Sequence, residues 1–175
     1  MKPYLSPSQL NTACRCPEAY RRSYIEGEKI PPGIAAHTGT GVHAGAAANF
    51  RQKQFSHNDL PVADIVEASV AGFEEAVSSR GTSFSDSDRS RGTGLVISEE
   101  KDRVARLAEV HAVTVQPEYQ PVPESVEQSV RITLPDSSHD LLGVVDLIDE
   151  KDRVVDFKTA KRKKSQRDAD DSVQL

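Results

Sequence analysis

The stretch GVVDLIDEKDRVVDFKTAK, residues 143–161, decides the fold that this sequence predicts. Two short apolar runs lie on either side of a polar turn, a pattern typical of two antiparallel strands joined as a hairpin. With residues 150–152 as a three-residue loop, Asp149 lies opposite Arg153. An aspartate inside the loop tolerates the left-handed backbone that such loops need. The stretch therefore predicts a strand, a tight turn and a second strand.

The same register brings two carboxylates and an amine to one patch of sheet. Asp146 lies opposite Asp156, and Lys158 points to the same face as Asp156 because it follows two positions later. Neighbouring carboxylates repel unless positive charge lies between them, and Mg²⁺ suits such oxygen ligands. The alternative is that these charges are simply solvated. Apolar neighbours around both acids favour a metal-dependent site, because strands apolar on both faces are buried and ionised groups there need partners.

The length and composition of the chain limit the classes of protein to which it can belong. The chain has 175 residues, enough for one ordinary domain, and a net charge of −5, so its overall charge gives no indication of a nucleic-acid partner. A local basic patch can still attract one. Its two cysteines lie too close together for an ordinary structural disulfide, and the sequence has neither a signal peptide nor an apolar run of membrane-spanning length. We expect a cytoplasmic protein.

Helical patterns dominate the sequence before the hairpin. Ser6, Pro7 and Gln9 form a capping box that begins a helix reaching about residue 25, which Pro17 breaks or kinks. A second helix opens at residues 37–44, and its small residues predict close packing, which we expect against the sheet. Further patterns predict helices at about 61–79 and 96–115, a mobile loop at 81–94 and a strand at 125–134.

This order of elements predicts an α/β fold in a single domain, residues 1–175. A helical part of about 1–120 precedes a motif-bearing sheet of about 122–160. No cap or stop signal follows Leu175, so we expect the last helix to be cut short at the C-terminus.

Four blocks of residues occur in an order that resembles a known family. They are LSPSQL at 5–10 with Cys16-Pro17, GTGVH at 39–43, GVVD at 143–146 and VDFKT at 155–159. Together they resemble the PD-(D/E)XK nuclease superfamily, specifically its RecB-like exonuclease branch. Gln174 stands where that branch has a Q-x-x-x-Y helix, although the chain ends before a tyrosine. The resemblance implies a restriction-endonuclease-like core, a mixed β-sheet flanked by helices.

The resemblance also implies a role for each matching position. His43, Asp146, Asp156 and the carbonyl of Phe157 would hold Mg²⁺ or Mn²⁺. Lys158 would position the attacking water and stabilise charge on the phosphate, acting with Asp146 and Asp156 as the catalytic set. Gln174 would orient Lys158 or the DNA.

Three other features carry weaker predictions. The basic run Lys161, Arg162, Lys163 and Lys164 is either a solvated loop or a clamp for nucleic-acid phosphates, and its position favours the clamp. Cys14 and Cys16 supply fewer than the four thiolates of an iron–sulfur cluster, so we expect none within this chain. We expect Glu127 on the solvent side of its strand, with a metal role as the alternative.

The resulting hypothesis is an exonuclease-type, metal-dependent DNA nuclease of repair, recombination, phage or defence processes. DNA is the expected partner, with a helicase or recombination protein as a further one, and no membrane. Two alternatives stay open: a nuclease-fold module that binds DNA or a protein without cutting, and a fragment of a larger helicase–nuclease.

Overall fold

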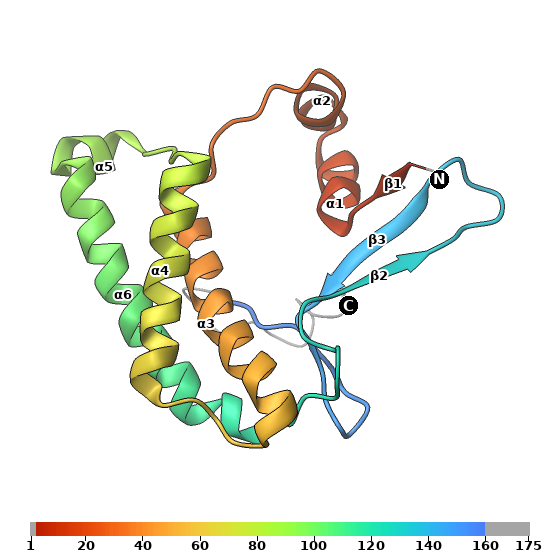
Figure 1. Ribbon diagram of the computed structural model, residues 1–175. Coiled ribbons are helices and arrows are strands. Elements are labelled where there is room, and N and C mark those ends of the chain that lie inside the picture. Colours follow the sequence, from red (N-terminus) through yellow and green to blue (C-terminus); the bar gives the residue numbers. More distant parts are fainter. Residues whose placement is uncertain (1–2, 160–175) are drawn as a thin grey trace. The chain divides into compact units, whose positions relative to one another are not determined.

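A computed structural model describes residues 3–159, and the chain forms two compact units (Figure 1). The first contains residues 3–30 and 128–145, and the second contains residues 31–127 and 146–159. The fold is mixed α/β with a helical N-terminal half and a small mixed sheet, as predicted. The division into units does not test the prediction of one domain, which stays a prediction.

The first unit holds the three-stranded mixed sheet. Its central strand, β3 (Asp140–Val145), pairs in parallel with β1 (Tyr4–Leu5) and antiparallel with β2 (Gln128–Ile132). Helix α1 (Pro7–Arg15) follows β1 directly.

The predicted capping box begins α1. Ser6 Oγ accepts the N–H of Gln9 at 3.3 Å, and Gln9 Oε1 accepts the N–H of Ser6 at 2.6 Å. The helix predicted to reach about residue 25 breaks at Pro17, as predicted, because proline lacks an N–H. The remainder forms α2 (Pro17–Tyr20) and a π-helical turn, η1 (Arg21–Ile25).

The second unit contains the longer helices. In chain order it comprises α3 (Ile34–Ser56), α4 (Val62–Arg80), α5 (Asp86–Arg91), α6 (Thr93–Thr114), the 3₁₀ turn η2 (Gln116–Glu118) and the strands β4 (Leu147–Ile148) and β5 (Val154–Val155). The mobile loop predicted at 81–94 is wrong, because a second capping box at Ser85 and Asp88 begins the short helix α5. Among residues 3–159, no helix is both long and apolar enough to cross a membrane.

The small residues of α3 pack against α4, not against a sheet as expected. A Cβ atom added to Gly41 would lie 2.8 Å from the carbonyl oxygen of Ser69, and one added to Gly45 would lie 2.6 Å from that of Ile65. Gly72 of α4 has the same relation to Ala44, whose Cβ would be 2.4 Å away. The two helices therefore approach as closely as their backbones allow, and this packing fixes the position of α3.

The motif hairpin has the predicted register. Leu147 pairs with Val155, and the N–H of Asp149 donates to the carbonyl of Arg153 at 3.1 Å. Asp152 holds the left-handed loop position with φ 57°. Extended by one pair, this register sets Asp146 opposite Asp156.

The strand predicted at 125–134 is shorter, and residues 121–127 belong instead to the second unit. Glu124 and Glu127 have φ values of 61° and 52°, which no strand accommodates. The N–H of Val122 donates to the carbonyl of Ile148 at 3.1 Å, and that of Glu127 to the carbonyl of Asp146 at 3.0 Å. This segment therefore borders strand β4 and the bend that carries Asp146.

An apolar core joins the hairpin to α3. Ala46, Phe50 and Leu147 are buried at its centre, and the partly buried side chains packed around them are Tyr119, Val126, Val155 and Phe157. Burial of both faces of both predicted strands is wrong, however, because Val144 and Val154 are 59% and 62% exposed. Each lies on the face of its strand away from its packed neighbours.

Candidate active site

Helix α3 and the start of the hairpin bring His43 and Asp146 together. The Nδ1 atom of His43 lies 3.4 Å from Oδ2 of Asp146. Asp146 occupies a bend between β3 and β4, where its carbonyl accepts the N–H of Glu127. The two side chains are 29% and 18% exposed, so both remain accessible from solvent. Two residues that the sequence predicted as metal ligands therefore lie side by side in the second unit.

The main chain of Phe157 completes this group. Its N–H donates to Oδ2 of Asp146 at 2.7 Å, and its main chain also accepts a hydrogen bond from His43. Phe157 therefore fixes the carboxylate of Asp146 with its amide and lies next to the imidazole of His43. Its carbonyl was predicted as a further metal ligand from the resemblance.

These contacts change the protonation of both side chains. The hydrogen bond to Asp146 raises the pKa of His43, against the opposing effect of burial. Burial alone would raise the pKa of Asp146, but His43, the amide of Phe157 and the charge of Lys158 together hold it below its usual value. Asp146 is therefore ionised at neutral pH, and His43 keeps its proton to a higher pH than an isolated histidine.

Asp156 and Lys158 form the second pair of the site. Lys158 Nζ donates to Oδ1 of Asp156 at 2.8 Å, which confirms that the two side chains share a face. Lys158 is 49% exposed, and Asp156 is 23% exposed. The amine of Lys158 is thus available to an anionic ligand from solvent.

The donor chemistry of these residues fits a divalent cation. Carboxylate oxygens and a main-chain carbonyl suit Mg²⁺, and an imidazole also permits Mn²⁺. Within residues 3–159, however, no three His, Cys, Asp or Glu side chains lie close enough together to hold a metal ion. Asp156 turns to Lys158, while His43 and Asp146 face each other. The structure thus brings the predicted ligands together in pairs.

A surface hollow adjoins His43. It has a volume of about 400 Å³ and is lined by Ala36, Gly39, Thr40, His43, Ala44 and Glu127. Thr159 lies at its edge, since its Oγ1 would be 3.1 Å from a Cβ added to Gly39. Glu127 forms an ion pair with Arg51 and is 41% exposed, so it faces solvent while also lining the hollow.

Nothing in the sequence motifs indicates what holds the Phe157 ring. Phe50 stacks on it with centroids 5.6 Å apart, and Tyr119 and His111 meet it edge to face at 5.8 and 4.8 Å. Burial, with a smaller contribution from the charge of His43, lowers the pKa of His111 to about 4. No sequence motif includes His111. Its place on the side of α6 facing the core was the one available signal.

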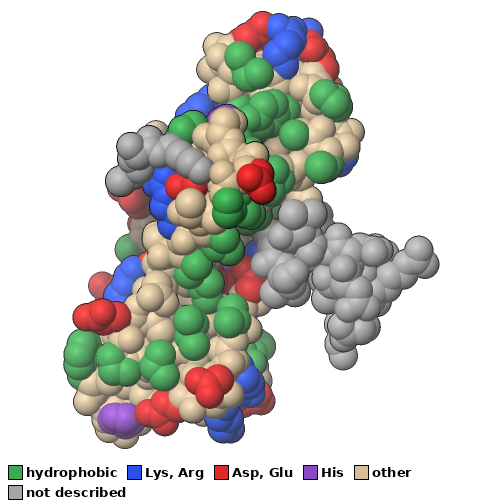
Figure 2. Space-filling model, turned by 90° about the vertical axis from the view of Figure 1, so that its right-hand side faces the viewer, with side chains coloured by type: hydrophobic (Ala, Val, Ile, Leu, Met, Phe, Trp, Pro, Cys, Tyr) green, Lys and Arg blue, Asp and Glu red, His purple; other side chains and the backbone are tan. Residues whose placement is uncertain are grey.

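Two predicted groups of site residues lie outside the described residues. They are Gln174 and the basic run Lys161, Arg162, Lys163 and Lys164. On the face drawn in Figure 2, the described Lys and Arg side chains lie in separate groups beside Asp and Glu.

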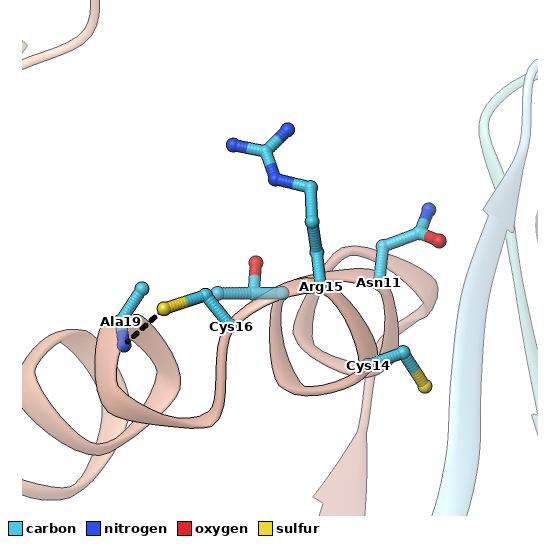
Figure 3. Close-up of a pocket in the computed structure, with 6 residues that line it drawn as sticks. Asn11, Cys14, Arg15, Cys16 and Ala19 are labelled. Carbon is cyan, nitrogen blue, oxygen red and sulfur yellow. Dashed lines mark hydrogen bonds between the residues drawn. The ribbon is translucent and has the colours of Figure 1, made fainter.

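Cys14 and Cys16 lie in the first unit as exposed free thiols. They line a hollow with Asn11, Thr12, Arg15 and Ala19. Figure 3 shows their side chains pointing in different directions, with Sγ of Cys16 accepting the N–H of Ala19 at 3.4 Å. Cys16 thus caps α2, and the two thiols do not converge on a shared point.

The comparison with protein families covers nearly the whole chain. The family model of the PD-(D/E)XK nuclease superfamily matches residues 4–175. No curated protein and no solved structure gave a match. The matched model does not specify a branch, so the RecB-like assignment stays a resemblance. Because the match covers nearly all of its length, the chain belongs to the PD-(D/E)XK nuclease superfamily.

Proposed function

We propose that the chain is a DNA nuclease that hydrolyses phosphodiester bonds with a divalent cation, Mg²⁺ or Mn²⁺. Membership of a nuclease superfamily supports a nuclease-type function, and the DNA substrate and the choice of metal are proposals. The observation that carries the proposal is the group of His43, Asp146 and the main chain of Phe157, with Lys158 paired to Asp156 nearby in sequence. A domain that only binds nucleic acid has no need of that combination.

His43, Asp146, Asp156 and the carbonyl of Phe157 would hold the cation. A bound divalent cation polarises a phosphoryl oxygen and makes a water molecule more acidic. The protein contributes the orientation of the ligands: the Phe157 amide holds one oxygen of Asp146, and that carboxylate is already ionised at neutral pH. His43 must give up its proton to bind a cation, so metal affinity should fall as the pH drops below its raised pKa.

Lys158 pairs its positive charge with the Asp156 carboxylate. Its ammonium group is half exposed and donates to Asp156 at 2.8 Å, so that pair orients it without burying it. An ammonium held in this way stabilises the negative charge that grows on a phosphate during attack by water. We therefore assign Lys158 the role of orienting the water and stabilising the transition state.

The finer parts of the proposal rest on the sequence. They are exonuclease action, a role in repair, recombination, phage or defence processes, a helicase or recombination partner, and a cytoplasmic location. The basic run of residues 161–164 would contact phosphates, and Gln174 would orient Lys158 or the DNA.

Cleavage of labelled DNA tests the proposal. Linear single- and double-stranded DNA and closed circular DNA are incubated with the protein and Mn²⁺, Mg²⁺ or a chelator. We expect metal-dependent loss of the linear substrates while circular DNA persists, as an exonuclease requires a free end. Cleavage of the circles would replace exonuclease with endonuclease action.

Two lysines of the hairpin provide the matched comparison. Lys158→Ala should reduce cleavage by about 10²–10³-fold, the usual effect of removing one preorganised electrostatic group. Lys151→Ala is the control, because Lys151 is an exposed residue of the loop whose amide, not its amine, contacts Asp149. Equal activity of the Lys158→Ala variant and the wild type would refute the assignment of the site. Metal and DNA binding without cleavage by the wild type would favour a binding module.

A further inference from the structure

A chain of buried and partly buried hydrogen bonds leads from the α3–α4 connection to the candidate active site. Asn49 Nδ2 donates to Asp59 Oδ1 at 2.7 Å and to Gln116 Oε1 at 2.6 Å. Gln116 Nε2 then contacts Nδ1 of His111 at 2.9 Å. Asn49 and Gln116 are almost fully buried, and the buried Lys53 anchors the far end by donating to both oxygens of Asp59. These residues all belong to the second unit.

The carboxylate of Asp59 sets the direction of every bond in this chain. An ionised carboxylate only accepts, so the Asn49 atom facing it must be the amide nitrogen. That amide then donates to the carbonyl oxygen of Gln116, whose own amide nitrogen faces His111. His111 must therefore accept at Nδ1 and carry its proton at Nε2. The Asn49 carbonyl, left over by this arrangement, accepts the N–H of Leu60 at 2.6 Å, as the assignment requires.

The fixed imidazole of His111 lies against the Phe157 ring. The ring centroids are 4.8 Å apart and the planes cross at 87°. The Nε2 atom of His111 is buried without a hydrogen-bond partner in the described part of the chain. Within the described residues, the imidazole of His111 therefore hydrogen-bonds to Gln116 through Nδ1. Its ring also contacts the ring of Phe157.

Phe157 transmits this contact to the site through its backbone. Its amide holds Asp146, its main chain accepts from His43, and the next residue is Lys158. A ring that is stacked on Phe50 and bordered by His111 has one packed orientation. A shift of that ring would move the peptide that two of the expected metal ligands contact.

We propose that His111, oriented by Gln116 and Asn49, is a positioning residue that holds Phe157, and with it Asp146 and His43, in the geometry that binds the metal. This inference rests on the proposed function, because it concerns the same site. Groups that orient metal ligands typically change metal affinity or activity by about 10–100-fold when they are removed. His111 should act in this way although it does not reach the metal.

Two substitutions separate the two contacts of His111. His111→Asn keeps an acceptor for Gln116 but removes the ring that borders Phe157. His111→Phe keeps the aromatic edge but loses the acceptor. The matched control is His37→Asn, because His37 is also a buried histidine of the second unit but donates its Nε2–H to the carbonyl of Gly81 at 2.9 Å, away from Phe157.

The experiment measures Mn²⁺ affinity by calorimetry, kcat and KM for DNA cleavage, and the melting temperature for each full-length variant. We expect His111→Asn to weaken Mn²⁺ binding and lower kcat by about 10-fold or more, with KM for DNA unchanged. His111→Phe should stay within about threefold of the wild type in both. His37→Asn should lower the melting temperature alone.

Three results would overturn the proposal. Folded His111→Asn protein with wild-type Mn²⁺ affinity would do so, as would equal losses in the His37→Asn control. Absence of Mn²⁺ binding by the wild type would remove the site itself. Wild-type protein that binds Mn²⁺ but does not cut DNA would refute the proposed function only, because the Mn²⁺ affinities of the variants would still decide the role of His111.

Discussion

The buried histidine His111 should make the stability of the protein depend on pH. Burial lowers the pKa of His111 from 6.5 to about 4 in the folded chain. Between these values the unfolded chain binds a proton that the folded chain does not, so the free energy of unfolding must fall as the pH falls. From about pH 7 to about pH 5 this one group should remove about 2 kcal/mol of stability. The His111→Asn variant has no ionisable side chain at this position. The same change of pH should therefore reduce its free energy of unfolding by about 2 kcal/mol less than that of the wild type.

Urea unfolding followed by circular dichroism measures the effect, since the chain has no tryptophan for fluorescence. The comparison uses the change between the two pH values within each protein, so a constant loss of stability in the variant does not matter. The pKa of His43 is raised, so its contribution to stability changes with pH in the opposite direction. Because both proteins contain His43, this contribution cancels to first order when they are compared. His57→Asn is the control: His57 is exposed, with a left-handed φ of 56° that asparagine tolerates. Equal losses in the wild type and His111→Asn would refute the reasoning.

Three further predictions, with Gly94→Ala as the control for the first, concern helix packing, the hairpin turn and a helix cap, each measured by urea or thermal unfolding. Gly45→Ala should destabilise the second unit by about 1–3 kcal/mol, because its Cβ would lie 2.6 Å from the Ile65 carbonyl oxygen. Gly94→Ala, with open space around it, should be neutral or stabilising by up to about 1 kcal/mol. Asp149→Ala should lose about 2 kcal/mol, because buried Asp149 accepts two backbone N–H groups and the Arg153 guanidinium in its own turn. Ser6→Ala should lose about 1 kcal/mol with the capping box, and hydrogen exchange in α1 should rise.

The register of the motif hairpin was predictable because its turn is local. The length of its loop sets the register, and Asp152 is a residue that accepts the left-handed loop position. The pairing of Lys158 with Asp156 follows in turn from the two-residue period of an extended chain. No distant part of the sequence enters either argument.

The packing of α3 was only half predictable. Its run of glycine and alanine indicated close approach, but a small-faced helix fits a sheet or another helix equally well. The missing signal lay in α4, where Gly72 faces Ala44 and Ser69 faces Gly45. Such complementarity depends on the relative rotation of two helices, which the pattern within either helix does not determine.

The support behind Phe157 was not predictable from the sequence. It joins Asn49, Gln116 and His111, residues of two helices and a 3₁₀ turn that show no shared motif or spacing. A hydrogen-bond chain of this kind exists only once the helices have packed. The resemblance identified His43, Asp146 and Phe157, but it carried no information about the residues that hold them.

The candidate site thus consists of two pairs held by different forces. The Asp156–Lys158 pair follows from the local geometry of the hairpin and has an exposed amine. The His43–Asp146 pair joins residues about a hundred positions apart, so its 3.4 Å separation depends on where α3 lies against α4 and on the peptide of Phe157. A change in helix packing should therefore disturb His43 and Asp146 first and leave Asp156 and Lys158 paired. In the proposed site a cation would contact members of both pairs, so its affinity should report on the packing of the second unit.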